Sequence, residues 1–540
     1  MLTRIASGRI IDPVSNRDET GDLWIRDGRI VAPPPYEAAD EILDARGCVV
    51  MAGAVDVHSH VAGGNLALAR LLLPELGIPE APESGAAAVA WTARATGRLY
   101  ARMGYTTVVE PALPPAAALG VHLELADIPL IDRAALAVLG NDDQLLSLLR
   151  DGESRDAVRD LVALTLATSR GLGVKVINAG GAAAFKEGVR RFDLDDEVPS
   201  YGLSSRRILL ALLDAVEALG VPHPLHVHCS NLGLHDAADT FVATLEAAEG
   251  RPIHFAHAQF YAYTLHEGGG IGSTAERICA ALQQHPRATL DVGQVVFGQT
   301  CTLSLDTLRQ FAARGSARPR KWVLVDGDAE GGGLVPFAYA RRNVTNAMQF
   351  AIGLEFFLRS PDPWRVLLTT DHPNGGPFTA YPRLLHLLMD KEERDQTVAE
   401  LPKAARERSR LPALEREYSL TEVAIMTRAA PARLLGLSDR GHLAPGAKGD
   451  VAVYRDERDR TAMFGRARFV LKDGETVVRD GEIVSERTGR TLALDPPTEA
   501  AMARRTDAYL QDRFGSGLQS FAVPEAAFAG PVFQVEPCRI

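Results

Sequence analysis

Two histidines separated by a single residue, His58 and His60, have the type and spacing that bind metal ions. They follow the run VVMAGAVDV, whose β-branched and small residues predict one buried strand over residues 49–57. Side chains at positions i and i+2 of a strand point to the same side, so both imidazoles would project together from its end. They could then coordinate one metal ion. For an isolated His-x-His motif, the alternative is a pair of polar residues that water satisfies at a strand end.

Other predicted strands also carry residues that could bind metal or exchange protons. Lys175 lies inside the apolar run GVKVIN, where an amine must either reach solvent along its stem or serve a function. The remaining candidates lie in three further runs: His226 and His228 in PLHVHCSN, His254 and His257 in PIHFAHAQF, and Asp371 in WRVLLTTDHPNGG. An aspartate after an apolar run is costly unless it is paired, caps a helix or binds metal. Neutral imidazoles and carboxylates are the expected ligands of Zn²⁺, with one coordination position left to water.

The elements that must position these residues lie between residues 52 and 435, where apolar strands alternate with helical stretches. The strand candidates after the His-x-His motif are TTVVEPA, GVKVIN, PLHVHCS, PIHFAHAQF, ATLDVG, KWVLVDG and WRVLLTTD. This alternation predicts a parallel sheet, and about eight strands over ~380 residues suit a (β/α)₈ barrel with insertions. A doubly wound open sheet is the alternative. In a barrel, the candidates would converge at the C-terminal ends of the strands, where such folds carry their chemistry.

Residues 1–51 and 436–495 differ from this middle region because they read as short alternating strands with Asp-Gly turn signals. We expect the two segments to pair with each other into one small β-sandwich; two unrelated β-rich appendages are the alternative. Residues 496–540 would form a C-terminal tail with a helix and an extended end. The predicted fold class is therefore α/β, with a (β/α)₈ TIM-like barrel and a composite β-sandwich domain from both termini.

The composition limits the classes of function. Of the 540 residues, 46% are hydrophobic and 24% are charged, as in globular proteins, and the net charge of −11 argues against general nucleic-acid binding. The five cysteines form no C-x-x-C pair, so a disulfide framework, an iron–sulfur cluster and a cysteine-based zinc finger are poorly supported. Neither an apolar stretch of about 18 residues nor a signal-peptide pattern is present, so we expect a cytoplasmic protein without membrane contact.

The order of the candidate residues resembles that of the amidohydrolase superfamily. In that order His-x-His follows the first barrel strand, a lysine lies on the fourth, histidines end the fifth and sixth, and an aspartate ends the eighth. The strings HSHVAGGN, GVKVINAGG, HVHCSNLG, HAQFYAY and TTDHPNGGPFTAYP are more closely similar to the A subunits of formylmethanofuran dehydrogenases. They are also similar to the bacterial counterparts of these subunits, the hydrolase subunits of formyltransferase/hydrolase complexes. The resemblance covers nearly the whole chain.

This resemblance implies a binuclear zinc site. One metal would be held by the His-x-His pair and Asp371, the other by two later histidines, and Lys175 would bridge them after carboxylation of its amine by CO₂. The implied ligands are His58, His60, Lys175, His228, His257 and Asp371. Asp371 would also act as general base and acid. Whether one or two zinc ions bind, and whether the lysine is carboxylated, stays open at this stage.

Other polar residues near these motifs receive secondary roles. Of the two histidines in PLHVHCSN, His228 aligns with the motif, so His226 is expected to pack deeper in the barrel. His254 faces differently from His257 on a strand and is expected to be structural. The candidate substrate-binding residues are Asn231, His372 and Asn374. A loop histidine or asparagine that serves only a turn is the alternative for each of them.

The resemblance implies hydrolysis of N-formylmethanofuran, or of formylmethylofuran, to formate and the free amine of the carrier, within one-carbon metabolism. Expected partners are the other subunits of a formyltransferase/hydrolase complex and a pterin- or furan-type one-carbon carrier. Length and an Ala/Arg-rich composition favour the bacterial hydrolase complex.

Three alternatives to this function remain. The chain could be the amidohydrolase subunit of a true formylmethanofuran dehydrogenase, whose oxidation another subunit must perform. It could be a cyclic amidase of the dihydropyrimidinase or dihydroorotase type. A non-catalytic scaffold is the third, and the complete ligand set argues against it.

Overall fold

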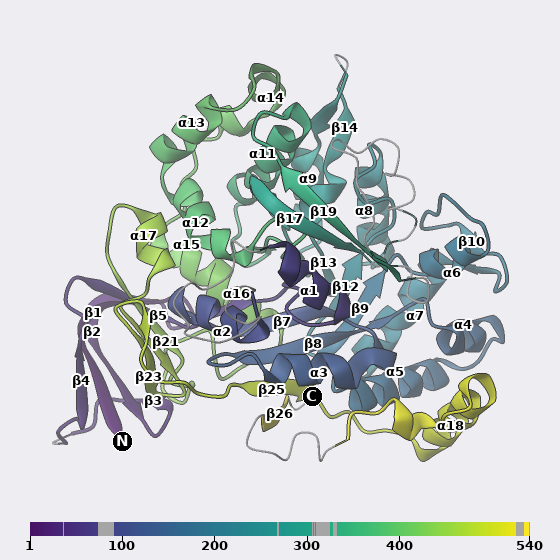
Figure 1. Ribbon diagram of the computed structural model, residues 1–540, viewed down its shortest axis with the longest axis horizontal. Helices are drawn as coiled ribbons and strands as arrows, with labels where there is room; N and C mark the ends of the chain where they lie inside the picture. Colours follow the sequence, from purple (N-terminus) through teal and green to yellow (C-terminus); the bar gives the residue numbers. More distant parts are fainter. Residues whose placement is uncertain are drawn as a thin grey trace.

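Two β-sheets organise the protein (Figure 1). The computed structural model describes residues 1–35, 37–73, 91–266, 269–304, 306, 308, 325–327, 332–524 and 534–538. Within this part of the chain, one sheet is a curled, parallel barrel sheet, and the other is a nine-stranded mixed sheet built from both ends of the sequence. No helix in the described ranges is long and apolar enough to cross a membrane.

The barrel sheet contains eight successive parallel strands, as the sequence predicts. They are β6 (Ala54–Asp56), β7 (Tyr105–Leu113), β8 (Asp132–Leu139), β9 (Gly173–Ile177), β12 (Leu225–His228), β13 (Ile253–Phe255), β16 (Ala288–Asp291) and β20 (Val366–Leu367). The ends of the row meet at a parallel bridge between Ser59 and His372, where the His60 amide donates to the His372 carbonyl at 2.8 Å. This bridge brings the segments after the first and eighth strands together.

Two details of the strand predictions are wrong. Strand β8 (DRAALAVL) was not among the candidates, because its alanines carry little strand preference. The run KWVLVDG lies mostly outside the described residues. Its described part, β18 (Val325–Gly327), pairs antiparallel with β19 (Gly332–Tyr339) in a separate sheet with β17 (Gly298–Ser304).

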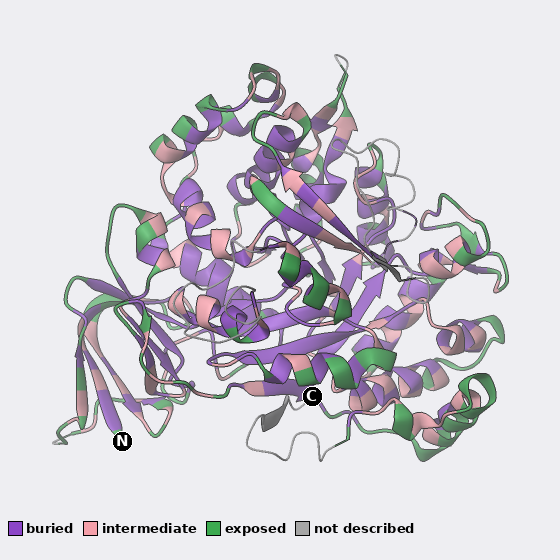
Figure 2. Cartoon of the chain, in the orientation of Figure 1, coloured by how far each residue is buried: buried purple, intermediate pink, exposed green. Residues whose placement is uncertain are grey.

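Helices that follow the barrel strands cover the barrel (Figure 1). They include α2 (Ala93–Arg102), α3 (Ala118–Ala126), α5 (Arg155–Ser169), α7 (Ser205–Ala218), α8 (Ala237–Ala247), α9 (Ala275–Gln284), α11 (Val344–Arg359) and α12 (Tyr381–Met389). In α7 the Ser204 side chain caps the helix by accepting from the Arg207 amide, and an apolar stripe is buried. Figure 2 shows the result: buried strands inside and exposed faces on the outer helices.

The flanking segments form one β domain, as predicted. In the mixed sheet the order is β24-β23-β22-β21-β5-β1-β2-β3, with β4 paired to β1. The strands from the N-terminal segment are β1 (Leu2–Asp12), β2 (Arg17–Arg26), β3 (Arg29–Val31) and β4 (Glu41–Asp44), and those from the C-terminal segment include β22 (Phe469–Lys472), β23 (Glu475–Arg479) and β24 (Glu482–Ile483). The junction between the two halves of the chain is the antiparallel pair of β5 (Cys48–Ala52) and β21 (Val451–Arg455). Two unrelated appendages are therefore excluded. The domain boundaries drawn from the sequence remain a prediction.

The strand expected over residues 49–57 is in fact two strands. Strand β5 ends at Ala52 in the β domain, and β6 begins at Ala54 in the barrel. Gly53 lies between them, and a Cβ on it would lie 2.2 Å from Thr106 Oγ1. The chain therefore crosses between the two sheets at a position where no side chain fits. The sequence does not reveal this break, because one apolar run continues from one strand into the other.

The end of the chain returns to the barrel. Strand β25 (Arg490–Leu494) pairs in parallel with the start of β8, and β26 (Gln534–Cys538) pairs with β25. The helix expected in the tail is α18 (Ala500–Phe514), which lies against α5. Residues 490–494 thus join the barrel sheet, although they follow the strands of the β domain.

A cluster of buried charges joins the β domain to the barrel. Lys472 ends β22 (Phe469–Lys472), and its ammonium lies 3.1 Å from Asp132 Oδ2 and 2.9 Å from Asp450 Oδ2. Arg440 Nη1 lies 3.0 Å from the same Asp132 oxygen. Burial alone would raise the pKa of Asp132, but the charges of Lys472 and Arg440 hold it well below its ordinary value. Asp132 therefore stays ionised beside Lys472 and Arg440, and these contacts fix the two sheets relative to each other.

We expect Lys472→Met to destabilise the protein strongly, because Asp132 and Asp450 would stay buried with one cation fewer. Removing one partner of a buried ion pair typically costs about 3–5 kcal/mol. Lys403→Met is the matched control, because Lys403 is exposed and faces Glu407 at 3.6 Å, where a pair contributes about 0–1 kcal/mol. Guanidinium unfolding measures both variants. Equal unfolding midpoints would contradict this role of Lys472.

Candidate metal centre

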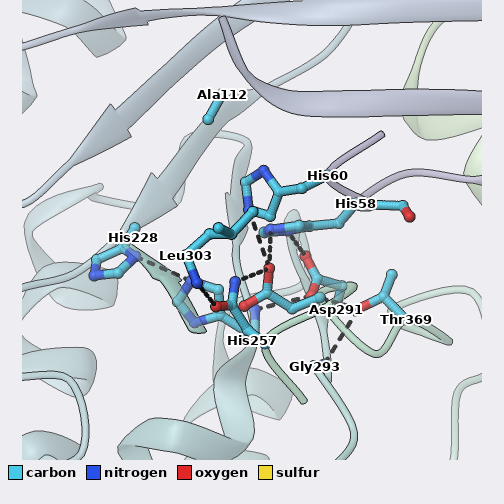
Figure 3. Close-up of polar contacts among 12 residues, drawn as sticks. His58, His60, Ala112, His228, His257, Asp291, Gly293, Leu303 and Thr369 are labelled. Carbon is cyan, nitrogen blue, oxygen red and sulfur yellow. Dashed lines mark hydrogen bonds and ion pairs between the residues drawn. The ribbon is translucent and has the colours of Figure 1, made fainter. Parts of the chain in front are cut away.

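The predicted histidines and aspartate meet at the C-terminal end of the barrel strands. His58 Nε2 lies 3.0 Å from Asp371 Oδ1, and His60 Nε2 lies 3.4 Å from the same oxygen. His257 Nε2 lies 3.0 Å from His228 Nδ1. Figure 3 shows the four imidazoles gathered around one centre. The chain therefore brings together all four predicted ligand histidines and the predicted carboxylate.

Unusual backbone conformations turn these side chains towards the centre. His257 and Asp371 both adopt the left-handed region, with φ of 35° and 50°. Gly293 passes so close to His257 that a Cβ on the glycine would lie 2.3 Å from the histidine Cβ. Asn374 Nδ2 donates to Asp371 Oδ1 at 3.1 Å, while its own oxygen accepts from the Leu303 amide. Strain of this kind in several strand-end residues is typical of functional sites.

Lys175 is enclosed with these residues. It is only 2% exposed, in a strand where it pairs with His226 of β12, so the alternative in which its amine reaches solvent is wrong. Burial lowers the pKa of Lys175 to about 8, although the negative charges of Asp291 and Asp371 oppose the shift. Its amine is therefore less strongly held as a cation than an ordinary lysine, and a neutral amine is the form that reacts with CO₂.

The His-x-His pair lies between carboxylates. Burial alone would lower the pKa of His60, but Glu110 and Asp371 raise it to about 10. Glu110 Oε1 accepts from His60 Nδ1 at 2.8 Å, and its Oε2 accepts from the Val61 amide at 2.8 Å. For His58, too, nearby carboxylates outweigh burial and raise the pKa. Without a metal the pair holds protons, and a metal ion would displace them.

The donor set fits a metal ion. Ligand atoms of His58, His257 and Asp371 lie within 4.8 Å of one another, and all three residues are buried. Burial lowers the pKa of His257 well below its ordinary value, so this imidazole is neutral, which is the form that binds metal. A second group that meets the same distance limit consists of His58, His226 and Asp291. Nitrogen and carboxylate ligands together suit Zn²⁺ and related divalent ions.

For His226 and His254 the structural role stays a prediction, since His226 also belongs to the second candidate metal group. Both side chains are fully buried. His226 Nε2 lies 3.2 Å from His58 Nδ1, and His254 Nε2 lies 3.2 Å from Asp291 Oδ2. Each one therefore contacts a group around the centre and not the space that the four converging imidazoles share.

His372 supports the centre through its backbone. Its carbonyl accepts from the His60 amide, and its ring packs edge-on against Trp91 and Phe378 at centroid distances of 5.0 and 4.9 Å. Burial lowers the pKa of its imidazole to about 3. The histidine is thus neutral and enclosed by aromatic rings; its predicted contact with substrate stays a prediction.

The two predicted substrate-binding asparagines are already engaged. Asn374 holds Asp371, as described above. Asn231 Nδ2 donates to Asp193 Oδ2 and Thr240 Oγ1, each at 2.9 Å. Asn231 also lines a groove of about 630 Å³, together with Asn178, Arg190, Phe192 and Asp306. Since Asp306 contacts His228, this groove adjoins the centre and offers room for a substrate.

The sequence reading missed three carboxylates that face the ligand histidines. Asp291 Oδ2 lies 2.9 Å from His58 Nδ1, Glu110 lies beside His60, and Asp306 Oδ2 lies 3.2 Å from His228 Nε2. Asp291 and Glu110 end or interrupt apolar strand runs (ATLD and TTVVEPA), which is the signal that identified Asp371. Asp306 follows β17 in a loop, and no local pattern marks it.

We expect replacement of both His58 and His60 by Ala to remove bound metal and abolish hydrolysis, because two ligand nitrogens leave the centre together. Metal content by mass spectrometry and turnover are the measurements. His442→Ala is the control, since that side chain is half-buried in a loop before β21 and bonds only within this loop, to the Ser438 carbonyl and the Ala444 amide. Full activity of the double variant without metal would show that the pair does not hold a catalytic ion.

Comparison with known proteins agrees with this architecture. The model of the Amidohydrolase family matches residues 41–484. The A subunit of the formyltransferase/hydrolase complex Fhc of Methylorubrum extorquens is 63% identical over 535 residues, which cover 98% of this chain and 97% of that protein. Protein FwdA of Methanocaldococcus jannaschii is 36% identical and covers 91% of this chain and 90% of its own length.

A solved structure extends the similarity to three dimensions. The crystal structure of the formyltransferase/hydrolase complex (FhcABCD) from Methylorubrum extorquens in complex with methylofuran contains a chain that matches with a TM-score of 0.95. That chain is 62% identical, and the match covers 100% of both chains.

Proposed function

This chain belongs to the amidohydrolase family, and from that premise we propose that it hydrolyses the N-formyl bond of formylmethylofuran or formylmethanofuran. The products are formate and the free amine of the carrier. The proposal is supported by the identity of 63% to one component of a formyltransferase/hydrolase complex and by the match to a complex that holds methylofuran. It also includes assembly with the other subunits of such a complex in the cytoplasm.

The observation that carries the chemistry is the position of Asp371. Its carboxylate lies 3.0 Å from His58 Nε2, inside a buried group of metal-competent side chains. Burial alone would raise the pKa of Asp371, but His58 and His60 hold it well below its ordinary value, so it is an ionised base. In hydrolysis it accepts a proton from the attacking water and returns it to the amine nitrogen as the C–N bond breaks.

The proposed metal is zinc, with two ions. His58, His60 and Asp371 would hold one, and His228 and His257 the other. Bound zinc polarises a carbonyl and lowers the pKa of water towards neutrality. The protein's own contribution is to hold these ligands in a largely buried site and to keep Asp371 oriented through Asn374.

Two other reactions use the same kind of centre, and one assay separates them. The purified complex receives the formylated carrier without an electron acceptor, and formate is measured against carrier amine. We expect equal amounts of both. Release of the carrier amine with CO₂ in place of formate, and only when an added electron acceptor is reduced, would favour a dehydrogenase subunit. Ring opening of dihydropyrimidines or dihydroorotate at a rate above formate release would favour a cyclic amidase.

Asp371→Asn is expected to keep much of the fold and some metal while losing turnover. Asparagine has nearly the same shape but cannot accept and return a proton, and a general acid–base group is typically worth about 10²–10⁴ in rate. Metal content is measured beside the rate, since an amide is also a weaker ligand. If the variant retains zinc and works within a few-fold of the unmodified protein, another group moves the proton.

Lys175 is expected to carry a carboxylate on its amine. A bare ammonium beside metal ions would repel them, whereas a carbamate provides anionic oxygens for both. Electron density at Nζ in crystals of the zinc-loaded, active protein is the measurement. A bare amine in such crystals would exclude the modification, and one metal with an unmodified lysine is the specific contradicting result.

A further inference from the structure

Asp291 ends β16, a strand that supplies none of the six ligands predicted for the metal. We propose that Asp291 is a positioning residue that keeps the proton of the His58 imidazole on Nδ1, so that the Nε2 lone pair faces the metal. The inference rests on the proposed metal centre but not on the identity of the substrate.

The contacts of Asp291 require it to accept a hydrogen bond from His58 Nδ1. Its Oδ2 lies 2.9 Å from His58 Nδ1 and 3.2 Å from His254 Nε2. Its Oδ1 accepts from the His257 amide and from Thr369 Oγ1, both at 2.8 Å. The residue is fully buried, and four donors surround its two oxygens. An ionised carboxylate only accepts hydrogen bonds, so His58 Nδ1 must be the donor.

A row of buried histidines on the other side of His58 also requires its proton to be on Nδ1. His223 Nδ1 lies 3.3 Å from the Leu434 carbonyl, which can only accept, so that nitrogen carries the proton. Burial keeps the His223 imidazole neutral, so its Nε2 is an acceptor. It accepts a hydrogen bond from His226 Nδ1, which lies 3.2 Å away. His226 Nε2 is then also an acceptor, 3.2 Å from His58 Nδ1. Both neighbours of that nitrogen therefore require a donor.

The remaining contact closes the network without conflict. His254 donates from Nε2 to Asp291, so its Nδ1 accepts, and Thr289 Oγ1 lies 2.8 Å from it as a donor. The proton on His58 Nδ1 then faces two acceptors, Asp291 Oδ2 and His226 Nε2, and no donor in the network faces another donor. Once a metal ion displaces the proton on His58 Nε2, that nitrogen presents its lone pair on the side of Asp371 Oδ1. Hydrogen bonds of this type from a ligand histidine to a carboxylate fix the tautomer and raise ligand basicity.

The same carboxylate also ties three parts of the centre together. It contacts His58 after the first strand, the His257 amide after the sixth, and Thr369 two residues before Asp371. Loss of its charge would therefore disturb the direction of several ligands, beginning with the protonation of His58.

The test is the metal affinity of Asp291→Asn in the assembled complex, stripped of metal and titrated with Zn²⁺ against a chelator. The asparagine side chain has an NH₂ group in place of one carboxylate oxygen. Both oxygens of Asp291 accept hydrogen bonds from donors, so this NH₂ group would face a donor in either orientation of the amide. With the NH₂ group towards His58, the imidazole must place its proton on Nε2, which faces the metal. We expect zinc affinity to fall about 10–100-fold, the usual effect of losing such a contact.

Asp142→Asn is the matched control, because Asp142 caps α4 (Asp143–Arg150) through the Leu145 amide, and asparagine caps helices about equally well. Its zinc affinity should not change. A folded Asp291→Asn variant with unchanged zinc affinity would overturn the inference.

A second measurement uses the unmodified protein and holds even if the variant fails to fold. Anomalous scattering from zinc-loaded crystals should place the ion on Nε2 of His58. An ion on Nδ1, between His226 and Asp291, would overturn the inference. A protein that binds zinc in this way but releases no formate would instead overturn the proposed substrate and leave the role of Asp291 standing.

Discussion

Burial of charge at the C-terminal end of the barrel is the constraint on which the rest of the structure depends. Asp291, Asp371 and Glu110 are all less than 5% exposed, and a buried carboxylate is costly unless donors surround it. Each one is compensated by an imidazole of the His-x-His pair. Histidines and carboxylates therefore stabilise one another in the absence of metal, and the same contacts orient the nitrogens that a metal would use.

Contacts of the barrel and of the β domain hold the buried charges in position at different places. Chain crossing at Gly53 sets the His-x-His motif immediately after a short strand whose start is fixed by the neighbouring sheet. The cluster around Lys472 holds that sheet against the start of β8. At the other end of the barrel, the bridge between Ser59 and His372 joins the first and last ligand segments. The centre is thus fixed from both ends of the first strand.

Much of this was predictable because the signal is local. A histidine, lysine or aspartate within or at the end of an apolar run is visible in the sequence, and parallel strands bring such ends together. The partners of those residues were harder to predict. Asp306 comes from a loop without periodicity, and β25 joins the barrel only because an edge of β8 is free to pair with it. Such pairings depend on tertiary packing and not on the residues of either segment.

The central claim is that metal bound at this site supports release of formate from a formylated carrier. The most direct measurement is a titration of the metal-free, assembled complex with Zn²⁺, in which formate release and bound zinc per chain are followed together. The account predicts that activity is absent without metal, rises with occupancy and reaches a plateau at no more than two ions per chain. Full formate release from the metal-free complex would contradict it.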